Sequence, residues 1–251
     1  MAELRIGRSW SDPEIASRLA SIEDLPVNFR DDPAELTSQR GWNSYYSEAM
    51  IAREPPGEPV PGGPFRRAEV GVANYQFSDP AIVVAHFETG SRLLGRRMLL
   101  EMKAFRLVRY LAGVVVGAVR FEEQNGRYVF GYRYDTLLGH IERGAEWFLL
   151  TKDGVTGEIT FRIEAGWLPG HFPNWWSRLG FRWVGPYYQR RWHQSAHHRL
   201  AGIAHAGMSA APAIDSLGIA HAGPAVAFGR TPAARQVPEP RVHEEESTRT
   251  T

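Results

Sequence analysis

Five side chains that can accept or donate protons lie close together in the middle of the sequence. They are Tyr134, Asp135, His140, Glu142 and Glu146. Histidine titrates near neutral pH and a neighbouring carboxylate raises its pKa, so such a pair can act as general acid and base. We name Asp135, His140, Glu142 and Tyr134 as candidate catalytic residues. Asp135 would be the base or orienting group, and His140 the proton shuttle.

The same stretch also fits a structural role. Gly139-His140 and Gly144 are typical of a connection between two strands, in which polar side chains bond to the amides of the loop. If residues 145–150 form a strand, alternation places Glu146 and Trp147 on opposite faces of the sheet. The residues alone leave the catalytic and the structural interpretation open.

Aromatic side chains crowd the predicted last strands and the predicted last helix. The candidate ligand-binding residues among them are Tyr132, Trp147, Trp167, Trp176 and Trp183. In a sheet curled around one helix, large aromatic rings either fill the core or line a cavity that accepts a small molecule. For such a fold the two interpretations overlap, because the cavity is the part of the core left unfilled.

Two histidines of the predicted last helix, His193 and His197, are four residues apart and so share one helix face. Two imidazoles on one face can bind a metal ion, but a site needs at least a third ligand, and the glutamate of the zinc-protease motif is missing here. We interpret the pair as part of a solvated helix face and predict no metal ion. The arginines of the same helix are interpreted as its polar side and not as a nucleic-acid surface.

The composition excludes several classes of function. Lys+Arg 29 against Asp+Glu 28 gives a net charge of +1, which argues against a nucleic-acid or anionic-membrane partner. The absence of cysteine excludes disulfides, thiolate catalysis and cysteine-ligated metal centres. Neither a nucleotide-binding glycine pattern nor a Gly-x-Ser-x-Gly nucleophile elbow occurs. We therefore expect no cofactor.

The chain shows no segment that would direct it out of the cytoplasm. Its first residues, Met1–Arg5, include acidic and basic side chains, unlike a signal peptide. The longest apolar run, 111–119, is about half the length of a membrane span. We expect a cytoplasmic protein, with a hydrophobic small molecule as partner and no membrane association. The oligomeric state is left open.

Three segments with different composition must position these residues. We expect residues 1–63 to form a helical and loop cover, with a capped helix after Ser11-Asp12-Pro13. The aromatic stretch 42–46 is expected to pack on the main domain or to cover it. Residues 203–251 form a low-complexity tail that we expect to be mostly disordered. In this tail Gly-Ile-Ala-His-Ala-Gly occurs at 202–207 and again at 218–223, so a docking peptide is the alternative.

The segment between them, 64–202, carries the ordered core. A helix is predicted from Pro64, and buried strands follow. Asn125-Gly126 predicts one hairpin and Asp153-Gly154 a second, so these strands are antiparallel neighbours. Residues 173–200 have helical spacing, with a kink or break expected at Gly185-Pro186. The order predicts an α+β fold, in which a curved antiparallel sheet wraps a long C-terminal helix.

The stretch 132–146, Tyr-Arg-Tyr-Asp-Thr-Leu-Leu-Gly-His-Ile-Glu-Arg-Gly-Ala-Glu, resembles a family signature. The family is the domain of unknown function numbered nineteen-ninety, whose usual form is Tyr-Gly-Thr-Leu-x-Gly-His-x-Glu-x-Gly-Glu. Residues 65–68 and 74–77 are similar to the opening helix of that family, and the resemblance covers about residues 64–200. Two positions depart from it: Asp135 stands where the family usually has Gly, and Tyr75 where Trp is common.

The resemblance implies a fold similar to the START-like, birch-allergen-like helix-grip superfamily, but no common activity. Our first hypothesis is a helix-grip pocket protein that binds a hydrophobic or aromatic small molecule. The alternative is a cofactor-independent cyclase, dehydratase or isomerase of bacterial specialised metabolism that uses the acid–base groups of the same pocket. A third hypothesis is an interaction protein that uses the repeated tail.

Overall fold

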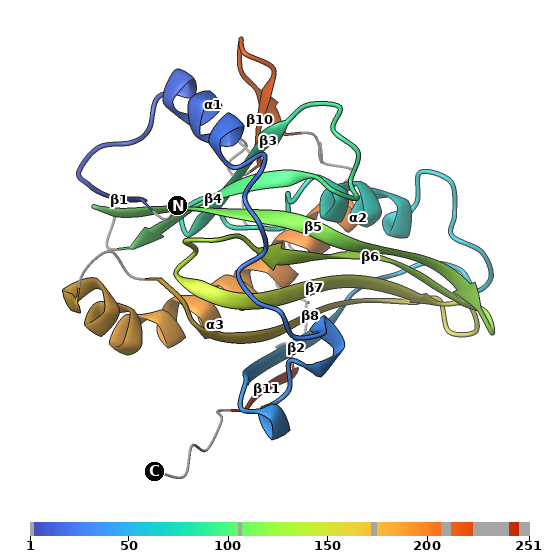
Figure 1. Cartoon of the computed structure of the whole chain (residues 1–251). Helices are drawn as coiled ribbons and strands as arrows, with labels where there is room; N and C mark the ends of the chain where they lie inside the picture. Colours follow the sequence, from blue (N-terminus) through green and yellow to red (C-terminus); the bar gives the residue numbers. More distant parts are fainter. Residues whose placement is uncertain (1–2, 105–106, 172–174, 207–211, 223–240, 246–251) are drawn as a thin grey trace.

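The computed structural model describes residues 3–104, 107–171, 175–206, 212–222 and 241–245, of which 175–186, 206 and 241–245 are described by their backbone alone. The strands of these residues form one antiparallel sheet in the order β11-β2-β8-β7-β6-β5-β4-β3-β10-β9, with β1 paired to β5 (Figure 1). The strands are β1 Glu3–Ile6, β2 Asn43–Arg53, β3 Val83–Glu88, β4 Arg97–Ala104, β5 Val108–Gln124, β6 Arg127–Thr136, β7 Glu142–Asp153, β8 Glu158–Pro169, β9 Ala213–Ile214, β10 Ile219–Ala222 and β11 Arg241–Glu245.

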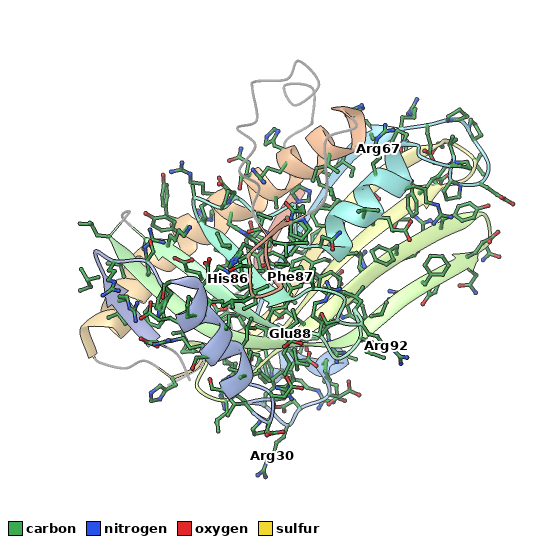
Figure 2. All side chains as sticks on the ribbon, turned by 90° about the horizontal axis from the view of Figure 1, so that it is seen from above. Arg30, Arg67, His86, Phe87, Glu88 and Arg92 are labelled. Atoms are coloured by element: carbon green, nitrogen blue, oxygen red, sulfur yellow. The ribbon has the colours of Figure 1, made fainter. Side chains whose placement is uncertain are left out.

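Helices cover both faces of this sheet. They are α1 Asp12–Ser21, α2 Pro64–Ala73 and α3 Trp175–Ala206, with two short 3-10 helices at Pro33–Glu35 and Ser38–Arg40. In Figure 1 α2 and α3 lie behind the sheet, and the view from above in Figure 2 places α1 on the opposite side. This is the predicted helix-grip arrangement, a curved antiparallel sheet with a long C-terminal helix across it.

Alternation along the strands separates the two faces. Met98 and Leu100 of β4 belong to the main core with α2 and α3, and we call this side the inner face. Leu99 between them packs with Ile15 and Leu19 of α1 in a second cluster on the outer face. Away from the bulges and the strand ends, successive residues of a strand therefore lie on opposite faces of the sheet.

Local sequence signals account for several elements. Pro64 begins α2, and the Glu14 side chain accepts a hydrogen bond of 2.8 Å from the backbone N–H of Ser11 at the start of α1. Asn125 and Gly126 join β5 to β6 with φ angles of 54° and 70°, as a two-residue hairpin requires. The predicted helix starts and both predicted hairpins are present.

The segment 1–63 contributes a strand that the sequence analysis does not predict. Residues Asn43–Arg53 form β2, which lies between β8 and β11 in the sheet. The side chains of Tyr45, Ser47, Ala49 and Ile51 are buried at alternate positions. Small and polar residues at two of these positions hide the apolar alternation that identifies a strand. The division of the chain at residue 63 stays a prediction, but β2 is an integral strand of the sheet.

The last helix is longer than predicted and is not divided. It runs from Trp175 to Ala206 through Gly185-Pro186. A proline removes one backbone hydrogen bond, and a helix of this length can continue past that loss. The helix includes Ile203 and Ala204 from the first copy of the repeat, and both side chains are buried.

The second copy of the repeat is also ordered. Residues Ile219–Ala222 form β10, which pairs with β3 at the edge of the sheet. The same sequence, Ile-Ala-His-Ala, thus forms the end of a helix at 203–206 and a strand at 219–222, because tertiary contacts override local propensity. Residues 203–206 and 219–222 belong to the tail that we expect to be mostly disordered, and they form the end of α3 and the strand β10. Residues 207–211, 223–240 and 246–251 lie outside the described part of the chain.

Among the described residues, no helix combines the length and the apolar character that crossing a membrane requires.

Candidate functional site

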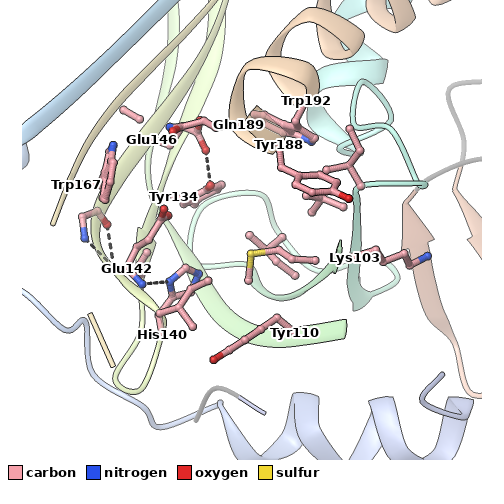
Figure 3. A pocket seen from close by; sticks show the side chains of 18 of the residues that line it. Lys103, Tyr110, Tyr134, His140, Glu142, Glu146, Trp167, Tyr188, Gln189 and Trp192 are labelled. Atoms are coloured by element: carbon pink, nitrogen blue, oxygen red, sulfur yellow. Dashed lines mark hydrogen bonds between the residues drawn. The ribbon is translucent and has the colours of Figure 1, made fainter. Parts of the chain in front are cut away.

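A cavity of about 360 Å³ lies between the inner face of the sheet and α3 (Figure 3). Most of its wall is apolar, and the wall consists of side chains from several strands of the sheet and from α3. Among the lining residues are Leu100, Met102, Tyr110, Trp167, Tyr188 and Trp192.

Polar groups gather at one end of this cavity. Tyr134 on β6 and Glu146 on β7 are directly opposite in the antiparallel register, and the Tyr134 hydroxyl donates a hydrogen bond to the Glu146 carboxyl group. His140 and Glu142 lie beside them, on the connection between the strands and at the start of β7 (Figure 3). The strand pairing thus brings three of the four candidate catalytic residues to one wall.

The connection between β6 and β7 is held firmly in place. Gly139 has a φ of 87°, a conformation that favours glycine. The Thr136 hydroxyl bonds to both backbone groups of Gly144, and the Asn28 amide donates to the Glu142 carbonyl at 2.9 Å. A Cβ on Gly144 would lie 2.0 Å from the Gly166 carbonyl oxygen, so only glycine fits there. These contacts fix the positions of the imidazole and carboxyl groups.

The His140 side chain forms a hydrogen bond within the loop and also lines the cavity. Its Nδ1 accepts a hydrogen bond of 3.0 Å from the backbone N–H of Glu142, which is the structural role expected for this residue type. Its buried Nε2 has no hydrogen-bond partner among the described residues. Burial lowers the pKa of His140 to about 4, so the ring is neutral and Nε2 carries the hydrogen. The ring, which lines the cavity, therefore carries a buried N–H that has no hydrogen-bond partner among the described residues.

Burial changes the protonation of the two glutamates in the cavity. It raises the pKa of Glu142 to about 7 and that of Glu146 to about 8. Burial also raises the pKa of Tyr134 well above its ordinary value, with a further increase from the neighbouring Glu146. A carboxyl group with a pKa near 7 can donate or accept a proton at neutral pH, which is the property of a general acid–base residue.

The two histidines of α3 extend this polar cluster into the protein. The Ser47 hydroxyl lies 2.9 Å from Nδ1 of His193 and 3.0 Å from Nε2 of His197. Nε2 of His193 lies 3.6 Å from Oε1 of Glu146. Burial lowers the pKa of both rings, to about 3 for His197. Tyr134, Glu146, His193, Ser47 and His197 thus form one chain of polar contacts.

The prediction that His193 and His197 lie on a solvated helix face is wrong. Their side chains are 1% and 0% exposed. They lie beside Trp192, Ala196 and Leu200, which form the buried stripe of α3. The order carboxyl, imidazole, hydroxyl resembles a catalytic triad, but Ser47 is fully buried between two rings and is not part of the cavity wall. The serine hydroxyl joins the rings and has no access to a substrate.

Two residues predicted for the site lie on the outer face. Asp135 lies between the inner residues Tyr134 and Thr136, so its side chain is on the opposite face. There its carboxylate accepts hydrogen bonds from Arg133, from Nε at 2.7 Å and from Nη2 at 3.0 Å. Trp147 alternates with Glu146, and its ring lies 5.6 Å from the Arg133 guanidinium. The period of two along β6 and β7 therefore separates Asp135 and Trp147 from the cavity.

The remaining ligand-binding candidates have different positions. Trp167 lines the cavity. Tyr132 is on the inner face but belongs to the core, with its ring 5.3 Å from that of Phe148. The side chains of Trp176 and Trp183 lie outside the described part of the chain.

Tyr75 and Lys103 are among the residues of the cavity wall that sequence reasoning missed. Tyr75 follows α2 with a φ of 58°, an uncommon conformation for a residue other than glycine. The available signal was its departure from the tryptophan common in the resembling family. Lys103, one of only two lysines in the chain, lines the cavity on β4 and donates to the Pro80 carbonyl at 3.0 Å. Its rarity among many arginines was the available signal.

Comparison with known proteins gives a family match and distant fold likenesses among solved structures. The model of a family described as "Domain of unknown function (DUF1990)" matches residues 33–200. Among solved structures, the crystal structure of Ara h 8.0201 has a TM-score of 0.38 and 11% sequence identity, covering 65% of this chain and 98% of that chain. A likeness this distant carries no argument about function. No curated protein matches the sequence.

Proposed function

The chain belongs to the DUF1990 family, which is described as a domain of unknown function, so we propose a function from the cavity. We propose that the protein binds a hydrophobic or aromatic small molecule. The supporting observation is a cavity of about 360 Å³ with a mostly apolar wall and a few convergent polar groups. Small-molecule sites typically have volumes of roughly 300–1,000 Å³ and this kind of lining.

The polar end of the cavity gives the ligand an orientation. With pKa values of about 7 and 8, Glu142 and Glu146 carry protons for much of the time at neutral pH and so can donate hydrogen bonds. The His140 imidazole adds a further donor. A ligand with a carbonyl or hydroxyl oxygen at one end satisfies these groups, while Tyr188 and Trp192 pack against its apolar part.

Catalysis by proton transfer is the second candidate function, as in a cofactor-independent cyclase, dehydratase or isomerase. The observation that favours it is the position of Glu142, whose pKa of about 7 suits a general acid–base role, at a wall that also carries His140 and Tyr134. In this proposal Glu142 exchanges the proton and His140 binds the developing charge. Asp135, on the outer face, takes no part.

Filling the cavity tests the binding proposal. Met102→Trp adds a large ring to the cavity wall, and Val155→Trp adds the same ring at a position that is 80% exposed. We expect the wild type and Val155→Trp to retain a small molecule in native mass spectrometry or to bind an uncharged naphthalene dye, and Met102→Trp to do neither. Equal binding by both variants, with both folded, would contradict the proposal.

A further inference from the structure

A cluster of imidazole and carboxylate groups lies on the outer face, away from the cavity. His86 of β3 and His221 of β10 are directly paired in the sheet, and Figure 2 labels His86. Asp215, in the turn between β9 and β10, and Asp12, at the start of α1, approach the same histidine. The cluster therefore joins the tail, the sheet and the first helix.

His221 faces both carboxylates with one nitrogen atom. Its Nε2 lies 3.0 Å from Oδ2 of Asp215 and 3.9 Å from Oδ1 of Asp12. The other oxygen of Asp215 accepts hydrogen bonds from the backbone N–H groups of Leu217 and Ile219, each at 2.9 Å. The turn thus fixes the Asp215 carboxylate so that its second oxygen is directed at the imidazole.

Hydrogen bonds on the far side decide which nitrogen of His221 carries a hydrogen. Glu101 forms an ion pair with Arg109, so its carboxylate is ionised and can only accept. His86 lies 3.3 Å from it through Nε2, which must therefore be the N–H. In the neutral ring, Nδ1 of His86 is then an acceptor, and His221 donates to it from Nδ1 at 2.7 Å.

This chain of donors leaves a lone pair on Nε2 of the neutral His221 ring. A lone pair directed at two carboxylates is a repulsive arrangement without a positive charge between them. The Glu101–His86 pair also matches the outer groups that orient metal-binding histidines through their second nitrogen. Imidazole nitrogen and carboxylate oxygen are donors that bind zinc and related ions.

We propose that His221, Asp215 and Asp12 bind a divalent transition-metal ion of the zinc type, with water completing the coordination. The three donor atoms lie within 4.8 Å of one another. Donor atoms of a tetrahedral zinc site are about 3.4 Å apart, and Asp12, whose side chain is 56% exposed, is free to close the remaining distance. The ion would fasten the second copy of the repeat to α1. The corresponding histidine of the first copy, His205, is an exposed residue of α3.

Cobalt and zinc binding to the full chain test this site. Asp215→Asn keeps an amide oxygen for the turn while removing the carboxylate, and Asp12→Asn changes an exposed side chain. Asp24→Asn, at an exposed position just after α1, is the matched control. We expect one Co²⁺ per chain with the visible absorption of a tetrahedral site. Zn²⁺ at a hundredfold excess over its Kd should raise Tm by roughly 5 °C or more.

Each of the two site variants should weaken Co²⁺ binding at least tenfold, and the control should bind as the wild type does. Two results would overturn the proposal. The first is no absorption and no change in Tm with either ion. The second is unchanged binding by both Asp12→Asn and Asp215→Asn. Neither result bears on ligand binding in the cavity, which lies on the other face of the sheet.

Discussion

Glu146 is the residue on which the polar end of the cavity depends. Its carboxyl group accepts a hydrogen bond from Tyr134, across the strand pair, and lies 3.6 Å from His193 on α3. It therefore connects the sheet to the helix through a buried carboxyl group. A buried, uncharged acid of this kind is stable only while its partners stay in place, so small shifts of α3 change its environment directly.

Asp135 has a structural explanation on the outer face. The strand β5 has a register shift between Val116 and Ala118, and Gly117 lies at this bulge beneath Asp135. A Cβ on Gly117 would lie 1.9 Å from Oδ2 of Asp135. The carboxylate can move aside only by giving up its pair with Arg133. Asp135 and Gly117 thus form a matched pair of residues.

This pairing predicts a non-additive effect on stability. We expect Gly117→Ala to lower the free energy of unfolding by about 1–3 kcal/mol, because the added methyl group overlaps the carboxylate. In the Asp135→Gly background the same change should cost much less, since the overlap is gone. Urea denaturation of the four proteins measures both values. Equal costs in the two backgrounds would show that the bulge itself, and not Asp135, excludes the methyl group.

Among the helices and strands, local sequence signals predict the hairpins and the helix starts. Long-range contacts determine the strand β2 and the buried face of α3. Asn125-Gly126 and Pro64 act on their own neighbours, so their effects can be predicted from the sequence. The strand β2 and the burial of His193 cannot be found this way. Ser47 of β2 and His193 of α3 are polar residues at buried positions, and each is satisfied by the other. A polar residue that is buried by a partner 146 positions away looks solvent-exposed in the sequence.

In the candidate site, too, some residues can be predicted from the local sequence and others depend on long-range packing. The stretch 134–146 identifies the correct wall of the cavity, because Tyr134, His140 and Glu142 all line it. The face of Asp135 could not be assigned, because a shift of one residue in the strand reverses every side chain. The positions of Tyr75 and Lys103 depend on how α2 and β4 pack, which no local pattern in these segments encodes.

The strand β10 should stabilise the edge of the sheet. Its Ala220 is fully buried opposite Phe87 of β3. We expect Ala220→Asp to release β10, because the new carboxylate would be buried without a partner. Hydrogen exchange of Val83–Glu88 should then become faster, while that of β7 changes little. The control is Leu217→Asp, at a position in the turn before β10 where the side chain is 53% exposed. Unchanged exchange in β3 would mean that β10 adds no protection.

In the molecule as a whole, the titratable groups around the cavity differ from the ion pairs of the outer face. The inner face buries carboxyl groups that resist ionisation and histidines that resist protonation, around one cavity. The outer face carries ion pairs such as Arg133–Asp135 and Arg109–Glu101. The carboxyl and imidazole groups around the cavity have pKa values shifted toward their neutral forms, so the stability of the protein must depend on pH.

The shifted pKa values of the histidines and of the glutamates change the stability of the protein in opposite directions. The pKa is lowered from 6.5 to about 4 for His140 and to about 3 for His197, so the unfolded chain binds more protons between about pH 3 and 6.5. Stability therefore rises with pH through that window. The pKa is raised from 4.5 to about 7 for Glu142 and to about 8 for Glu146, so the folded chain binds more protons between about pH 4.5 and 8. Stability falls with pH through this second window.

The two windows overlap between about pH 4.5 and 6.5, where the opposing contributions offset one another, so they predict a plateau of stability there and a decline above about pH 6.5. Above about pH 6.5 the histidine contribution is complete, and the carboxyl groups lower stability by up to about 1.4 kcal/mol per pH unit each. Urea denaturation midpoints between pH 4 and 9 measure this curve. Replacing both Glu142 and Glu146 by Gln should flatten the decline from pH 6.5 to 8, whereas Glu123→Gln, at an exposed position, should leave it unchanged. A decline that persists in the double variant would show that other groups ionise there and that the two carboxyl groups are already charged at pH 6.5.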